Sequence, residues 1–268
     1  MKNYNMSSKN YGLILSPPTP EDFIFGAQKL GDAQIQPDGQ WDGWLPDFEP
    51  QSRPGSFDSY GCVTFSTLSI VEILERHEYG ATRNWSDRFL AKASSTDKAR
   101  GNQPSVVAEI LRKKGCVEEK EMPFDSSITS FESFYSDIPQ KLWTLAIQFI
   151  AEYAFGYEHV PSNAKDIMRA LTYSPVLFTV SAWYKDENGL YYRPQGETDG
   201  HAVTCYGYEE GKYFKILDSY ADNEGLFLKK VRWDSLPMQC KRFTLNRQIV
   251  VESAWTKFLK LLREILGL

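Results

Sequence analysis

Hydrophobic positions recur at helical spacing through the first two thirds of the chain. The densest run is Val63, Phe65, Leu68, Ile70, Val71, Ile73 and Leu74. It is too dense for an exposed helix and too long for a typical strand, so we expect a mostly buried helix that follows Cys62 and is capped by Asp58 or Ser59. Further helices are expected over residues 85–92, 104–114, 142–153 and 162–171.

The period changes to that of strands after Pro175. Short β-branched or aromatic runs occupy residues 176–183, 201–208, 213–218 and 226–231, separated by turns rich in Gly, Asp and Asn. A helical half followed by a β half predicts an α+β fold with two lobes and a ligand-binding cleft between them.

The two ends of the chain have patterns of their own. Residues 1–56 are rich in Pro, Gly, Asp and Gln, which predicts an extended arm with one or two short strands. Residues 251–268 alternate apolar and charged positions as an amphipathic helix does, and such a helix docks on its own domain, on a partner protein or on a membrane surface. The expected layout is an arm at 1–40, a main domain at 41–250 with a helical lobe at about 57–158 and a β lobe at about 159–250 plus the arm, and a terminal helix at 251–268.

Composition narrows the class of protein. The 268 residues are 42% hydrophobic and 24% charged, with a formal charge of −5, which is typical of a globular chain and not of a disordered one. Without Lys/Arg clusters, a nucleic-acid partner is not expected. The first ten residues are polar and no run of about 18 apolar residues occurs, so we expect no signal peptide, no membrane span, and a cytoplasmic or particle-associated protein.

The cysteines and histidines are few and scattered. Four cysteines and three histidines occur without a CxxC pair or an HExxH motif, so neither a metal, another cofactor nor a disulfide framework is expected. Reduced thiols are the natural interpretation. Cys116, Cys205 and Cys240 are expected to be core or surface residues.

Cys62 and His201 are the residues that point to chemistry. A cysteine at a helix N-terminus can have a lowered pKa, although a lone cysteine is more often a small buried hydrophobe. If residues 209–212 are a hairpin loop, Tyr208 faces Tyr213, and His201 and Asp218 become diagonal neighbours on one face, roughly 7–8 Å apart. They are then either an ordinary hairpin pair or the base and orienter of a nucleophilic cysteine.

Three segments, in order, resemble motifs of the papain-like cysteine proteases. They are DSYGCVTFSTLSIVE (58–72), GHAVTCYGY (200–208) and FKILDSYADNEG (214–225), which are similar to that family's nucleophile helix, histidine strand and asparagine segment. Weaker similarities occur in WDGWLPDFEPQ (41–51), KKGCVEEKEMPFD (113–125) and DIMRALTYSPVLFTVSAW (166–183). The resemblance spans roughly residues 40–235.

The resemblance implies a papain-like two-lobed fold. It also implies a Cys62, His201 and Asp218 triad, with Gln51 and backbone N–H groups as the oxyanion hole. Gln51 lies eleven residues before Cys62, where the family pattern has six, so a longer intervening loop is needed. Since no long inhibitory pro-segment is recognised, the chain resembles the compact bacterial, archaeal and bacteriophage members. We expect either synthesis in active form or control by something other than a pro-peptide.

Other departures bear on the chemistry. Asp218 replaces the family's asparagine and Tyr220 its tryptophan, and Ser59 stands where many secreted members have a disulfide-bonded cysteine. An aspartate favours the imidazolium more than an amide does, so the thiolate–imidazolium pair is expected to persist to higher pH.

The leading hypothesis is a cysteine endopeptidase that acts on protein or peptide substrates through a covalent thioester. Two alternatives remain open. One is another chemistry at the same triad, such as an amidase or an acyl transferase. The other is a catalytically silent scaffold that binds a partner or forms part of a particle, supported by Val63, Tyr220, the displaced Gln51 and the terminal helix.

Overall fold

The computed structural model describes residues 11–16, 18–19, 23–25, 35–53, 57–181 and 184–248. The expected helix at 251–268 and the end of the strand predicted at 176–183 lie outside these residues. The helices are α1 (Cys62–Tyr79), α2 (Asp87–Ala93), α3 (Pro104–Lys114), α4 (Phe131–Phe134), α5 (Gln140–Glu152) and α6 (Ala164–Leu171), with 3-10 turns η1 (Asp42–Trp44) and η2 (Glu119–Glu121).

Most of the strands lie in the second half of the chain. In chain order, the strands are β1 (Ser52–Arg53), β2 (Phe57–Asp58), β3 (Tyr153–His159), β4 (Val176–Val180), β5 (Tyr184–Lys185), β6 (Tyr191–Tyr192), β7 (His201–Glu209), β8 (Tyr213–Leu217), β9 (Leu228–Arg232) and β10 (Cys240–Arg247). Within the described residues, eight of them form one sheet in the order β3-β10-β4-β7-β8-β9-β6-β5, antiparallel except between β6 and β9. The fold class is α+β, as expected.

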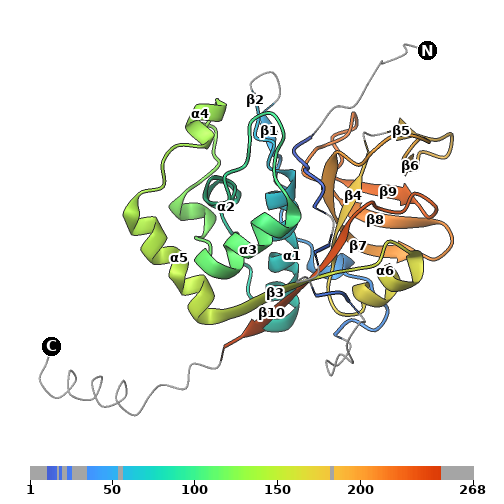
Figure 1. Ribbon diagram of the computed structural model, residues 1–268, viewed down its shortest axis with the longest axis horizontal. Helices are drawn as coiled ribbons and strands as arrows, with labels where there is room; N and C mark the ends of the chain where they lie inside the picture. The colour runs from blue at the N-terminus through green and yellow to red at the C-terminus, as the bar shows by residue number, and fades with distance from the viewer. Residues whose placement is uncertain are drawn as a thin grey trace, which may run out of the picture.

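Helix α1 lies between the other helices and the sheet (Figure 1). It packs against α2 and α3 on one side and against β4, β7 and β10 on the other. Almost every residue from Cys62 to Glu75 is buried, which explains why its hydrophobic pattern is too dense for a surface helix. The helix ends at Gly80, whose left-handed backbone lets its N–H bond to the carbonyls of Glu75 and Arg76.

Several local expectations needed correction. Neither Asp58 nor Ser59 caps α1; the cap position is Gly61, without a side-chain hydrogen bond. Helix α6, predicted to begin at residue 162, begins at Ala164 and is capped by Asn163. The chain is not helical throughout before Pro175, because Tyr153–His159 form β3, which pairs with β10. Strand β3 was missed because its tyrosines and phenylalanine continue the apolar spacing of α5.

The hairpin of β7 and β8 contains one irregularity. Near the turn, Glu209 pairs with Tyr213 and Tyr208 with Phe214, one residue away from the predicted Tyr208–Tyr213 pairing. A register shift between Cys205 and Gly207 then restores the predicted register, in which Thr204 pairs with Leu217. The end of the hairpin that carries His201 and Asp218 therefore has the expected alignment.

Among the described residues, no helix is both long and apolar enough to cross a bilayer. The four cysteines, all of them described, are buried and free.

Candidate active site

His201 and Asp218 meet at the edge where α1 faces the sheet. His201 begins β7 and Asp218 directly follows β8. Nε2 of His201 lies 2.6 Å from Oδ1 of Asp218, and both side chains are completely buried. Burial by itself would raise the pKa of Asp218, but His201 and the neighbouring Lys229 ammonium hold it below its ordinary value. Asp218 is therefore a carboxylate that accepts a hydrogen bond from Nε2 of the imidazole ring. The other ring nitrogen, Nδ1, is not engaged by Asp218.

Cys62 is the first residue of α1 and is also completely buried. Its thiol lies next to the backbone of Ala202, the residue after His201, whose hydrogen bond lowers the thiol pKa. Burial outweighs this contribution and raises the pKa of Cys62 well above its ordinary value. The structure thus brings the cysteine and the histidine strand together in a state in which the thiol keeps its proton.

The turn before Cys62 is tightly constrained. Tyr60 has a left-handed backbone (φ 56°), which is unusual for a residue with a side chain. An aspartate turn supports it, because the N–H of Tyr60 donates to Oδ1 of Asp58 at 2.8 Å. Next along the chain, the N–H of Gly61 donates to Oγ of Ser59 at 3.2 Å. These bonds fix the direction in which the chain enters α1 and hence the position of the thiol.

Gln51 is brought to the same place by a short hairpin. Strands β1 and β2, which lie between Gln51 and Cys62, pair Ser52 with Asp58 and Arg53 with Phe57. The N–H of Ser59 donates to the carbonyl of Gln51 at 3.2 Å. Gln51 therefore lies beside the turn that precedes Cys62, although eleven residues separate it from the cysteine in the sequence.

The Gln51 amide is held in one orientation. Its Oε1 accepts from the hydroxyl of Ser219 at 2.6 Å, and its Nε2 donates to the hydroxyl of Tyr220 at 2.7 Å. The Tyr220 hydroxyl in turn donates to Asp58. Since Nε2 also lies 3.3 Å from the carbonyl oxygen of Tyr11, the donor side of the amide faces a peptide carbonyl. This is the arrangement that an oxyanion-binding group needs.

The carbonyl that Gln51 binds belongs to the N-terminal segment 11–16, which runs between the helices and the sheet (Figure 1). On the sheet side, the N–H of Tyr11 donates to the carbonyl of Gly200 at 2.9 Å, and its ring lies 5.6 Å from that of His201. On the helical side, the N–H of Asn102 donates to the carbonyl of Gly12 at 2.9 Å. The segment thus contacts both sides of the site and contributes to the complete burial of Cys62 and His201.

Gly12 has no room for a side chain. Its backbone is left-handed (φ +111°), and a Cβ atom there would lie 2.2 Å from the carbonyl oxygen of Tyr60. Segment 11–16 is therefore fitted closely over the turn that precedes Cys62. The sequence predicts an extended arm here, and in the structure residues 11–16 of this arm cover the site.

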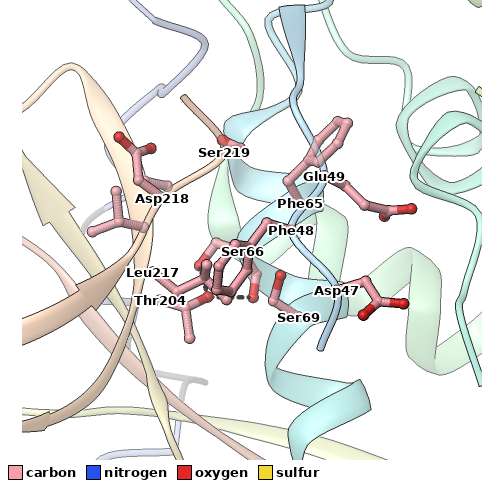
Figure 2. Close-up of a pocket in the computed structure, with 12 residues that line it drawn as sticks. Asp47, Phe48, Glu49, Phe65, Ser66, Ser69, Thr204, Leu217, Asp218 and Ser219 are labelled. Carbon is pink, nitrogen blue, oxygen red and sulfur yellow. Dashed lines mark hydrogen bonds between the residues drawn. The ribbon is translucent and has the colours of Figure 1, made fainter. Parts of the chain in front are cut away.

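On the other side of Asp218 the two lobes are closely packed. Figure 2 shows the space between α1 and the ends of β7 and β8, with the carboxylate of Asp218 pointing away from it. The space holds about 10 Å³, room for about one water molecule. The hydroxyl of Thr204 closes it by donating to the carbonyl of Ser66 at 3.1 Å (Figure 2). On this side of Asp218, the space among the described residues is therefore too small for a ligand larger than water.

Similarity to known proteins is found at the level of the fold and not of the sequence. No family model matches the chain, and no curated protein matches it by sequence. Among solved structures, xylellain, a cysteine protease from Xylella fastidiosa, is similar over 88% of this chain and 96% of its own, with a TM-score of 0.64 and 17% identity. The chain has a papain-like fold.

Other structures with this papain-like fold agree. The bromelain protease from Ananas comosus, solved with the E64 inhibitor, is similar over 77% of this chain and 98% of its own (TM-score 0.56, 19% identity). Digestive procathepsin L 3 from Tenebrio molitor is similar over 88% and 76% (TM-score 0.62, 15% identity). At these identities the likeness establishes the fold alone.

Lys229, Asp58 and Tyr11 are further neighbours of the site that the sequence did not predict. Lys229 carried a signal, since it shares one face of its predicted strand with Phe227 and Val231, where a charged residue is out of place. Asp58 was considered only as a helix cap. Nothing local distinguishes Tyr11, whose position depends on contacts with residues about 40 and 190 positions away. No group of three or more His, Cys, Asp or Glu side chains suited to a metal ion occurs in the described part of the chain.

Proposed function

We propose that this protein is a cysteine peptidase in which Cys62 is the nucleophile, His201 the general base and acid, Asp218 the orienting group and Gln51 a donor to the oxyanion. The observation that carries the proposal is the buried 2.6 Å contact between His201 and Asp218 next to Cys62. This contact engages Nε2 of the ring, so Nδ1 is the nitrogen left to exchange a proton with the thiol.

The chemistry follows from these positions. His201 takes the thiol proton on Nδ1, and the Cys62 sulfur bonds to the substrate carbonyl carbon while the oxygen gains negative charge beside Gln51. The C–N bond breaks as the leaving amine receives the proton from His201. Water then attacks the thioester, gives a proton to His201, and releases the acid and the Cys62 thiol. The balance requires only peptide and water.

A substrate needs the space that residues 11–16 occupy. In the covered state, burial disfavours the thiolate, so an active state requires this segment to leave the site and water to reach Cys62. Gly12→Ala is the matched opening variant, because its Cβ would meet the Tyr60 carbonyl. Gly43→Ala is the control, since a Cβ at Gly43 meets nothing within 4 Å.

The test is labelling by an epoxide inhibitor of cysteine peptidases, with the modified residue located by mass spectrometry. We expect stoichiometric modification of Cys62 in Gly12→Ala, slower modification in the natural chain and in Gly43→Ala, and none in Cys62→Ala. His201→Ala in the Gly12→Ala background should suppress the modification. A folded, reduced Gly12→Ala variant whose Cys62 alkylates without being labelled by the epoxide would overturn the proposal and favour a silent scaffold.

A further inference from the structure

Lys229 is a buried lysine in contact with the proposed triad. It lies on β9, where the inward positions are Lys229 and Val231 and the outward Leu228 is exposed, so a charged residue takes a core position. The Lys229 side chain is only 2% exposed. A buried ammonium is stable only when it is paired.

The partners of Lys229 identify its role. Its Nζ donates to Oδ2 of Asp218, while Oδ1 of the same carboxylate faces His201. Nζ also donates to the carbonyl of Tyr220 at 2.9 Å and lies 5.6 Å from the ring centre of Tyr191. Asp218 is therefore shared between a permanent cation on one oxygen and the imidazole on the other.

Counting charges shows what this sharing does. With a neutral thiol and imidazole, Asp218 and Lys229 sum to zero; after the proton moves from Cys62 to His201, the four groups again sum to zero. Without Lys229, the same enclosed site would carry a net charge of −1 in both states. Such a charge would stabilise the imidazolium and disfavour the thiolate.

We propose that Lys229 is a positioning residue of the active site, which cancels the charge of Asp218 so that the pair orients His201 as a neutral group would. The proposal rests on the proposed function. It changes the expectation drawn from Asp218 alone, since an aspartate paired with a lysine does not extend the thiolate–imidazolium pair to higher pH as an unpaired aspartate does. Lys229 thereby sets the pH range in which Cys62 and His201 form their ion pair.

Other groups around His201 do not replace Lys229. The titratable and charged groups that face His201 and its partners from the surrounding elements are Cys62 from α1, Asp58 from β2, Tyr11 from segment 11–16, Tyr220 from the loop after β8 and Tyr191 from β6. The pKa values of the three tyrosines are raised, first of all by burial, so they are neutral at physiological pH. Among these groups, Lys229 is the permanent cation.

The test separates this role from simple stabilisation. The imidazole of His201 is titrated by NMR in the full chain with Cys62→Ala, where it is one of only three histidines. We expect Lys229→Met to raise the pKa of His201 by about one unit or more, Asp218→Asn to lower it by a similar amount, and the double variant to return it to near the starting value. Lys229→Arg, which keeps the charge, should leave it in place.

The double variant also guards against misfolding, since it leaves no unpaired charge in the core. Equal His201 titrations in Lys229→Met and Lys229→Arg, or shifts of the same sign in the two single variants, would overturn the proposal. In the chain with Cys62, both limbs of the pH–rate profile should move with His201. Shifts of the expected sign without any peptide hydrolysis would refute the proposed function and leave the role of Lys229 intact.

Discussion

Buried acidic groups have opposite pKa shifts on the two sides of the site. On the helical side, burial raises the pKa of Glu72, Asp87 and the Cys62 thiol. On the sheet side, Asp218 is buried just as completely, yet His201 and Lys229 lower its pKa. Burial alone therefore does not determine the ionisation of these groups, because the paired cations keep Asp218 charged.

The two sides of the site therefore differ in how their ionisable groups are held. On the sheet side, the buried carboxylate of Asp218 contacts both His201 and Lys229. The helical side holds a protonated thiol whose state depends on the covering segment.

The first prediction is that each side supplies an indispensable group. Cys62→Ala and His201→Ala should each reduce peptide hydrolysis by the opened Gly12→Ala enzyme by about 10⁶-fold, and the double variant should be no worse, because the groups act as one unit. The measurement is kcat on a fluorogenic peptide. Cys240→Ala removes another buried thiol and should leave kcat essentially unchanged. Additive losses in the double variant would show that the two sides act independently.

The second prediction concerns Gln51. Gln51→Ala should lower kcat by about 10²–10³-fold with little effect on KM, because the lost donor serves mainly the transition state. Gln40→Ala is the control, since Gln40 also bridges to β7 but bonds to Tyr208 at the far end of that strand. A change confined to KM would remove Gln51 from the oxyanion hole.

The third prediction concerns the covering segment. Gly12→Ala should accelerate hydrogen exchange at the Asn102 amide, which donates to the Gly12 carbonyl, by at least about tenfold, equivalent to about 1.4 kcal/mol of lost closure. Gly43→Ala should not. If exchange at Asn102 stayed slow in Gly12→Ala while the variant became reactive, the cover would open by a route that leaves this bond intact.

The fourth prediction compares how the stability contributed by each side depends on pH. Burial raises the pKa of Glu119, on the helical side, from its ordinary value of 4.5 to about 7. The folded state therefore holds a proton that the unfolded state releases, and stability falls as pH rises from 4.5 through 7. Glu119→Gln should remove this fall in the free energy of unfolding, which we expect to be about 1–2 kcal/mol after allowance for partial exposure. The measurement is urea unfolding at a series of pH values.

The sheet side should show the opposite sign. Because the pKa of Asp218 is lowered, its ion pair contributes stability above pH 3.8 that is lost as pH falls through the lowered value. The Asp218→Asn, Lys229→Met double variant should therefore lose less stability on acidification than the natural chain. The same sign of pH dependence on both sides would contradict the comparison.

Much of this organisation was determined by the sequence itself. The dense apolar run after Cys62 predicted a buried helix, Pro104 and Gly115 marked the ends of α3, and the alternation around His201 and Asp218 predicted their shared face. Such features depend on local periodicity and on neighbours in the chain, which a single sequence displays. The predicted caps of α1 were wrong and β3 was not predicted, because neighbouring residues carried competing signals of similar strength.

Only the tertiary structure decided what surrounds those residues. The contacts around the site join segments that are distant along the chain. Lys229 pairs with Asp218, Ser219 and Tyr220 orient Gln51, and the ring of Tyr11 packs against His201. Their energies come from desolvation and charge pairing inside a closed core, and these exist only once the lobes have packed. The sequence thus named the reactive groups, while packing set their charge and their access to solvent.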